Sequence, residues 1–175
     1  SRYLGQELNH RVGAARNLNA EYFKRIDALD FAMYHDDGQQ AVELKDADVI
    51  LVGVSRTSKT PTSVYLAHRG VKAANVPIVP GAELPQDLFR EPRPLVVGLT
   101  ISADRLIHIR RNRLAAMKET RAGDYTEEES VRREVIDAQR LFERENWPTI
   151  DVSRRSIEET AAAILNLLAS HREQA

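Results

Sequence analysis

The chain has 175 residues, 42% hydrophobic and 29% charged, so it holds enough apolar side chains for one hydrophobic core. It lacks Cys and balances 25 Lys and Arg against 26 Asp and Glu, which excludes a disulfide scaffold and argues against a nucleic-acid-binding protein. No apolar stretch approaches the ~20 residues that cross a bilayer, so we expect a cytoplasmic protein that binds neither membrane nor nucleic acid.

Apolar runs alternate along the chain with amphipathic segments, which favours an α/β fold with a mostly parallel sheet flanked by helices. Four runs predict strands: Asp48–Val52, Asn75–Val79, Pro94–Leu99 and Pro148–Val152. The first is almost uninterrupted, as expected of a strand buried on both faces. Pro77 in the second indicates an edge strand or a strand end, because proline cannot donate a ladder hydrogen bond.

Amphipathic segments predict four helices: Thr60–Arg69, Ser102–Met117, Thr126–Asn146 and Ser156–Leu168. The first has Pro61 in its opening turn and stops at Gly70, a common asymmetry of helix ends. The last two each open on a hydroxyl residue followed three positions later by Glu, which is the pattern of a capping box. An exposed loop is expected over Lys118–Tyr125 and a connection over Ala82–Arg93.

One segment joins the first predicted strand to the first predicted helix, where a phosphate-binding loop works. It reads Gly53-Val54-Ser55-Arg56-Thr57-Ser58-Lys59-Thr60. In such a loop the backbone amides converge on a phosphate, the lysine contacts the β- and γ-phosphates, and the last hydroxyl, here Thr60, ligates Mg²⁺. The pattern has Gly before the lysine because Gly tolerates unusual dihedral angles, but Ser58 stands there. The residues alone therefore allow a phosphate site or an ordinary strand–turn–helix connection.

Among nucleotide-binding proteins, a small phosphotransferase fits these residues best. The Asp-x-x-Gly and Asn-Lys-x-Asp motifs of a GTPase do not occur in the sequence. Arg110 and Arg113 precede the polar stretch, where a lid would bring cations onto the transferred phosphate; the alternative is a solvated helix face.

A phosphotransferase also needs a carboxylate to orient or deprotonate the attacking group. His35-Asp36-Asp37-Gly38 is the densest candidate, since a histidine and two carboxylates supply a base and a metal contact. The same residues also fit an ordinary Asp-Gly turn.

The stretch from Ala47 to Ser63 resembles the phosphate-binding region of the bifunctional kinase–pyrophosphorylases, the regulatory proteins of pyruvate, phosphate dikinase and of phosphoenolpyruvate synthetase. Four further parts of the chain resemble the same family in the same order: residues 22–28 with 35–38, 74–81, 98–101, and 147–152 continuing into 156–161. Together they cover the chain from about Tyr22 to Leu168, and an ordered set of this kind is more specific than one motif.

The resemblance implies a P-loop-kinase-like fold and two activities. Members of the family use ADP to phosphorylate an active-site threonine of the target enzyme, which inactivates it. They reverse this by letting inorganic phosphate attack the phosphothreonine, which releases pyrophosphate. The resemblance thus implies ADP, inorganic phosphate and Mg²⁺ as ligands, Gly53–Thr60 as the nucleotide and phosphate loop, and Lys59 as a catalytic residue. It also strengthens His35, Asp36 and Asp37 as catalytic candidates.

The segments around Asn75 and Val79 are more similar to the dikinase regulators, so pyruvate, phosphate dikinase is the expected protein substrate and phosphoenolpyruvate synthetase the alternative. Family members are longer at the N-terminus, so we interpret residues 1–40 as a connecting segment, the remnant of a longer protein, and residues 41–175 as the phosphotransferase domain. A homodimer is a further expectation. A P-loop kinase that uses ATP on a small metabolite, and a nucleotide-binding or dimerisation module without chemistry, remain alternatives.

Overall fold

The computed structural model describes residues 20–33, 41–91, 93–116 and 127–174. Four strands form one sheet in the order β2-β1-β3-β4, and each neighbouring pair is parallel. This confirms the predicted α/β fold with a parallel sheet. The strands are β1 (Val49–Val54), β2 (Ala73–Ile78), β3 (Leu95–Thr100) and β4 (Thr149–Asp151).

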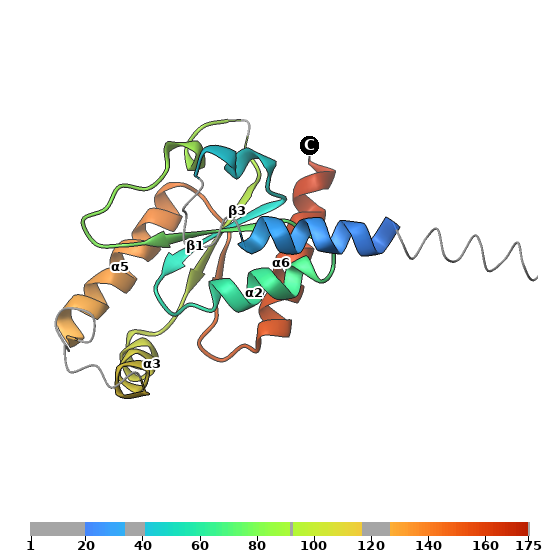
Figure 1. Ribbon diagram of the computed structural model, residues 1–175. Helices are drawn as coiled ribbons and strands as arrows, with labels where there is room; N and C mark the ends of the chain where they lie inside the picture. Colours follow the sequence, from blue (N-terminus) through green and yellow to red (C-terminus); the bar gives the residue numbers. More distant parts are fainter. Residues whose placement is uncertain (1–19, 34–40, 92, 117–126, 175) are drawn as a thin grey trace, which may run out of the picture.

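Helices cover both faces of this sheet. The elements are α2 (Lys59–Ala67), α3 (Ala103–Ala116), α5 (Glu128–Arg144) and α6 (Ile157–Glu173), with short 3₁₀ helices η2 (Ala41–Asp46) and η3 (Gln86–Leu88). α2 packs beside α6 on one face, and α5 packs on the other with α3 next to it (Figure 1). Within the described residues, every helix is too short or too polar to cross a bilayer.

β1 forms the centre of the core. All six of its residues are buried, because β2 and β3 flank it in the sheet and helices cover both of its faces. This is the environment that its nearly continuous apolar run predicts. β2 lies at the edge of the sheet, as Pro77 indicated.

α5 approaches the sheet closely at Gly98 of β3. A Cβ atom at this position would lie 2.5 Å from the ring of Phe142, so the glycine makes room for the aromatic side chain. Phe142 in turn lies beside Trp147, with ring centroids 6.2 Å apart. This contact fixes α5 over β3. β3 pairs with β1, the strand that leads into the predicted phosphate loop.

The structure differs from the sequence-based expectation at two helix starts. The first is a helix over residues 20–33, which was not predicted. It packs Ala28 and Ala32 against Ala67 of α2. Because Tyr22 and Phe23 are exposed, its sequence lacks a clear apolar face. The second is the start of α5. The sequence predicts that this helix opens with a cap at Thr126, but α5 begins at Glu128 with Glu127 as its N-cap. Thr126 itself lies outside the described residues.

The serine cap of the second predicted capping box is confirmed at the start of α6. The Ser156 hydroxyl accepts a hydrogen bond from the Glu159 amide at 3.1 Å and also lies 3.2 Å from the Glu159 carboxylate. α6 then continues to Glu173, past Leu168, the last residue that the sequence places on its inward face.

Candidate phosphate-binding site

The strand order marks the carboxyl end of β1 as a ligand site. From β1 the chain passes through α2 to β2 on one side, and it later returns to β3 on the other side. In open parallel sheets the connections diverge at such a switch point and leave a crevice there. A cavity of about 610 Å³ lies at this point, lined by Ser55, Arg56, Ser58, Lys59, Thr60, Pro61, Pro77, Val79 and Ile109. Five of these residues belong to the predicted loop, so the structure brings that loop to a cavity.

The backbone of the loop contains two residues with unusual dihedral angles. Arg56 (φ 71°) and Ser58 (φ 63°) both have left-handed backbone conformations, which residues other than glycine rarely adopt. Alternation of left-handed with other conformations turns successive amide N–H groups toward one side, where they attract an anion. The left-handed angle at Ser58 also explains why glycine is usual before the lysine of such loops.

Gly53 lets the loop close over the end of β1. A Cβ atom here would lie 2.9 Å from the carbonyl oxygen of Leu99 in β3 and 2.7 Å from the Thr57 hydroxyl. The carbonyl belongs to a paired strand and cannot move freely, so a larger residue would push the loop away from the sheet.

The Lys59 side chain folds back over the loop and contacts residues that precede it in the chain. Its side chain is buried, with 7% exposed, and its ammonium donates hydrogen bonds to the Val54 carbonyl at 2.8 Å and to the Thr57 hydroxyl at 3.3 Å. These two bonds hold the ammonium against the backbone and side chain of the loop. The charge thus lies in the wall of the cavity, where low exposure strengthens its attraction for an anion.

The first turn of α2 adds a positive end of a helix dipole to the same place. Ser58 is the N-cap, yet its side chain forms no cap bond with any described residue, and no acidic residue stands in the first turn among the described residues. The amides of this turn are thus not satisfied by the Ser58 side chain, which is the arrangement found where helix N-termini bind phosphate.

A buried polar cluster supports the start of α2 from β2. Asn75, 1% exposed, donates from Nδ2 to the Thr60 hydroxyl at 3.4 Å, and its Oδ1 lies 2.5 Å from the Ser63 hydroxyl. The Ser63 hydroxyl is also 2.9 Å from the Lys59 carbonyl. Asn75 therefore helps to orient Thr60. Sequence reasoning did not assign this role; the signal was an asparagine inside an otherwise apolar strand, where a polar side chain requires partners.

Of the two arginines predicted on the lid, the structure brings Arg110 to the loop and leaves Arg113 exposed. Arg110 is 1% exposed and pairs with Glu134 of α5, and it donates a hydrogen bond to the Ser55 carbonyl at 3.3 Å. Contact of either arginine with a transferred phosphate stays a prediction. His35, Asp36 and Asp37 lie outside the described residues.

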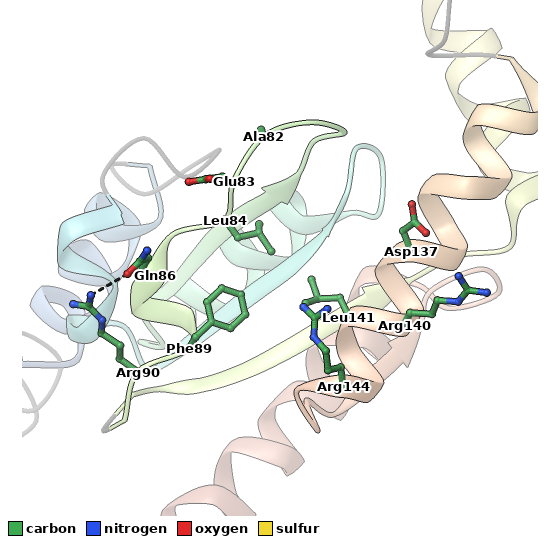
Figure 2. A pocket seen from close by; sticks show the side chains of 10 residues that line it. All are labelled: Ala82, Glu83, Leu84, Gln86, Phe89, Arg90, Asp137, Arg140, Leu141 and Arg144. Carbon is green, nitrogen blue, oxygen red and sulfur yellow. Dashed lines mark hydrogen bonds between the residues drawn. The ribbon is translucent and has the colours of Figure 1, made fainter.

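A second cavity, of about 700 Å³, lies between residues 82–90 and α5. Its charged side chains do not converge: Arg140 extends away from Phe89, and Glu83 points away from α5 (Figure 2). Arg90 is hydrogen-bonded to Gln86 at 2.9 Å. Ligand sites require a few polar groups aimed at one place, so the smaller cavity at the loop is the better candidate.

From the residues that the structure describes, a metal ion would take few acidic or histidine ligands. Among the described residues, no three His, Cys, Asp or Glu side chains are grouped for metal binding. Mg²⁺ commonly takes one or two protein oxygens, with phosphate oxygens and waters for the rest. The exposed Thr60 hydroxyl in the cavity wall is an oxygen of this kind, so the residues present fit such an ion.

A family model described as kinase/pyrophosphorylase matches residues 1–165 of the chain. The chain belongs to the kinase/pyrophosphorylase family. This confirms the resemblance found in the sequence, and the candidate loop lies inside the matched region of the kinase/pyrophosphorylase model.

Relatives from three bacteria carry the name "Putative pyruvate, phosphate dikinase regulatory protein". The protein of Caulobacter vibrioides is 62% identical over 172 residues, which are 98% of this chain and 55% of the relative. That of Maricaulis maris is 55% identical over 98% of this chain and 61% of the relative, and that of Bradyrhizobium diazoefficiens is 58% identical over 94% and 60%. The chain thus spans little more than half the length of these kinase/pyrophosphorylase relatives.

Proposed function

We propose that this chain carries the nucleotide-binding and phosphoryl-transfer site of a bifunctional regulator of pyruvate, phosphate dikinase. In one direction the protein transfers a phosphoryl group from ADP to a threonine of the dikinase, and in the other it uses inorganic phosphate to remove that group. The observation that carries the proposal is the loop after β1, where two left-handed residues, the start of α2 and the buried Lys59 ammonium border one cavity. The relatives' names support the dikinase as the target.

In the kinase direction, the threonine oxygen attacks the β-phosphorus of ADP. A new P–O bond forms to the threonine, the bond to the bridging oxygen breaks, and AMP leaves. The threonine proton passes to a base, for which His35, Asp36 and Asp37 are the candidates. The amides after Ser55 and the Lys59 ammonium stabilise the charge on the equatorial oxygens, which is the main catalytic need in phosphoryl transfer.

In the reverse direction, an oxygen of inorganic phosphate attacks the phosphorus of the phosphothreonine. The threonine oxygen leaves and takes up a proton, and pyrophosphate is released. In both directions the phosphoryl donor is an anion, and the attacking oxygen is negatively charged, either as inorganic phosphate from the start or as the threonine oxygen once its proton has passed to the base. One cationic cavity that holds the pair in line serves both reactions, because its charge offsets their repulsion.

Mg²⁺ would be held by Thr60 together with phosphate oxygens and waters, and when bound it would neutralise negative charge on the phosphates. Asn75 contributes by directing its amide N–H toward the Thr60 oxygen, which limits the orientations of that hydroxyl. The choice of ADP as donor, a homodimer and a cytoplasmic location belong to the same proposal and rest on the family resemblance.

Substitution of Lys59 tests the shared site. We expect Lys59→Ala to lower both activities of the protein that carries this chain by at least about a hundredfold, as loss of a transition-state charge contact does. The assays detect phosphothreonine formed on the dikinase with ADP, and pyrophosphate formed with inorganic phosphate. Lys45→Ala, which removes an exposed lysine of η2, is the matched control and should leave both rates unchanged.

Two outcomes would contradict the proposal. If Lys59→Ala retains one activity at a near-normal rate, the two reactions do not share this site. If the wild-type protein transfers phosphate from ATP to a small metabolite but not from ADP to the dikinase, the chain belongs to an ordinary metabolite kinase.

A further inference from the structure

Arg110 links three parts of the molecule at the base of the candidate loop. It is the largest of the fully buried side chains among the described residues. Its Nη1 lies 2.5 Å from one carboxylate oxygen of Glu134 on α5, and Nη2 lies 3.5 Å from the other. Nη2 also donates to the Ser55 carbonyl at 3.3 Å. One guanidinium therefore joins α3, α5 and the loop, which is possible because its donors form a rigid planar fork.

The hydrogen bond from Arg110 to the Ser55 carbonyl holds the peptide between Ser55 and Arg56. In a planar trans peptide the carbonyl and the following N–H point in opposite directions. A carbonyl held on Arg110 therefore turns the amide of Arg56 away from Arg110. Arg56 is also the first left-handed residue of the loop, with φ 71°. If this peptide turned over, a carbonyl oxygen would take the place of an amide N–H and would repel an anion.

The ion pair with Glu134 holds the Arg110 guanidinium in place, and it thereby fixes the hydrogen bond from Arg110 to the Ser55 carbonyl. The Glu134 side chain is 13% exposed and Arg110 is 1% exposed, so solvent competes little for either group. A buried pair of this kind is often no more stabilising than apolar residues of the same size, and packing α3 on α5 does not by itself require it. Asp104 and Arg132 form a second ion pair between the same two helices, at 2.5 Å, and that pair is exposed and does not involve the loop.

We propose that Arg110, held by Glu134, is a positioning residue that sets the orientation of the Ser55–Arg56 peptide and thereby the affinity of the loop for phosphate groups. This inference rests on the proposed function for its ligand, ADP. It assigns Arg110 a role inside the protein, through the loop backbone, and it gives Glu134 a part in the site.

The decisive variant replaces both partners with apolar residues of similar size, Arg110→Met with Glu134→Leu. It leaves no uncompensated buried charge, so we expect the midpoint of urea unfolding to stay near that of the wild-type chain. We expect ADP affinity, measured by calorimetry, to fall at least tenfold. The ¹H–¹⁵N resonances of the Arg56 and Thr57 amides in the ligand-free chain should also shift. Arg132→Met, which breaks the exposed pair, is the matched control and should change ADP affinity less than twofold and leave those resonances in place.

The outcomes separate this inference from the proposed function. If the double variant binds ADP within twofold of wild type and its Arg56 and Thr57 resonances are unmoved, Arg110 only packs the helices and the inference is overturned. If the wild-type chain binds no ADP, the proposed function fails, but the ligand-free resonances still decide whether Arg110 positions the loop.

A single variant covers the case in which the double variant does not fold. In Arg110→Lys the ammonium keeps the charge that pairs with Glu134, but it lacks the second arm that reaches Ser55. We expect the same shift of the Arg56 amide and a weaker binding of ADP. Wild-type resonances and affinity in this variant would overturn the inference.

Discussion

α2 and α6 both begin at a serine, yet the two serines act in opposite ways. Ser156 has an extended backbone (φ −71°, ψ 166°), and its hydroxyl accepts a hydrogen bond from the Glu159 amide. Two glutamates in the first turn of α6 place negative charge at the positive end of the helix. Ser58 has a left-handed backbone (φ 63°, ψ 26°), its side chain makes no cap bond to a described residue, and Lys59 follows.

The comparison shows that the residue type at a helix start does not tell whether that start is closed or open. The extended conformation of Ser156 turns its hydroxyl toward its own helix, so α6 satisfies its first amides internally. Ser58, with its left-handed conformation, does not cap the first amides of α2 with its side chain, and helix starts of this kind are common phosphate sites. An open helix end is therefore a candidate binding site, and a capped one is a stabilising feature.

The largest effect on stability and ADP binding is expected at Gly53, where the loop before α2 packs closely against β3. In Gly53→Ala the new methyl group meets the Leu99 carbonyl at 2.9 Å, so the loop must move away from β3. We expect the free energy of unfolding in urea to fall by about 1–3 kcal/mol, as overpacking does, together with at least tenfold weaker ADP binding by calorimetry.

Gly81→Ala is the control for this prediction. Gly81 has a positive φ of 81°, unlike Gly53, and a Cβ atom there would meet nothing within 4 Å. This variant therefore adds backbone strain without a clash and should bind ADP normally. Wild-type affinity in Gly53→Ala would show that the close approach to β3 does not matter for the loop.

A smaller effect is expected from removal of the closed cap. Ser156→Ala loses the hydrogen bond to the Glu159 amide, and we expect a loss of about 1 kcal/mol in the free energy of unfolding. ADP affinity should not change, because the Ser156 cap serves only its own helix. The comparison between the two starts breaks down if this variant binds ADP several-fold more weakly while it remains folded.

The smallest effect is expected from Ser58→Gly. Glycine removes the strain of a left-handed serine, but it also makes the unfolded chain more flexible, so the two contributions nearly cancel. We expect the free energy of unfolding to change by less than about 1 kcal/mol and ADP affinity to stay within twofold. A large loss of affinity would mean that the Ser58 hydroxyl itself contacts the ligand, and the start of α2 would not be open in the sense argued above.

Local features of the sequence were enough to predict much of the fold. The apolar run of β1, the proline in β2 and the serine cap at Ser156 each have a local physical cause, and the structure bears out all three. The helix over residues 20–33 was missed because its packed side consists of small residues such as Ala28 and Ala32, while Tyr22 and Phe23 are exposed. A helix that buries alanines and exposes aromatics has no readable apolar face.

The candidate site was predicted in part. The residues of the loop follow from their order between a buried strand and a helix, and the structure places five of them along one cavity. The partners of the loop did not follow from the sequence. Arg110 and Glu134 are 24 positions apart, and Ser55 is 55 positions from Arg110, so no local pattern relates the three residues.

The sequence by itself therefore determined the four strands, the helices α2, α3, α5 and α6, and the loop that carries the lysine, since hydrophobic periodicity, proline and turn residues act over a few positions. Only the tertiary structure decided that Ser58 adopts a left-handed backbone, that Asn75 supports Thr60, and that Arg110 lies buried beside the loop. The physical reason is that these features depend on distant segments packed together, where the burial of a polar group is tolerated only if partners from other elements meet it.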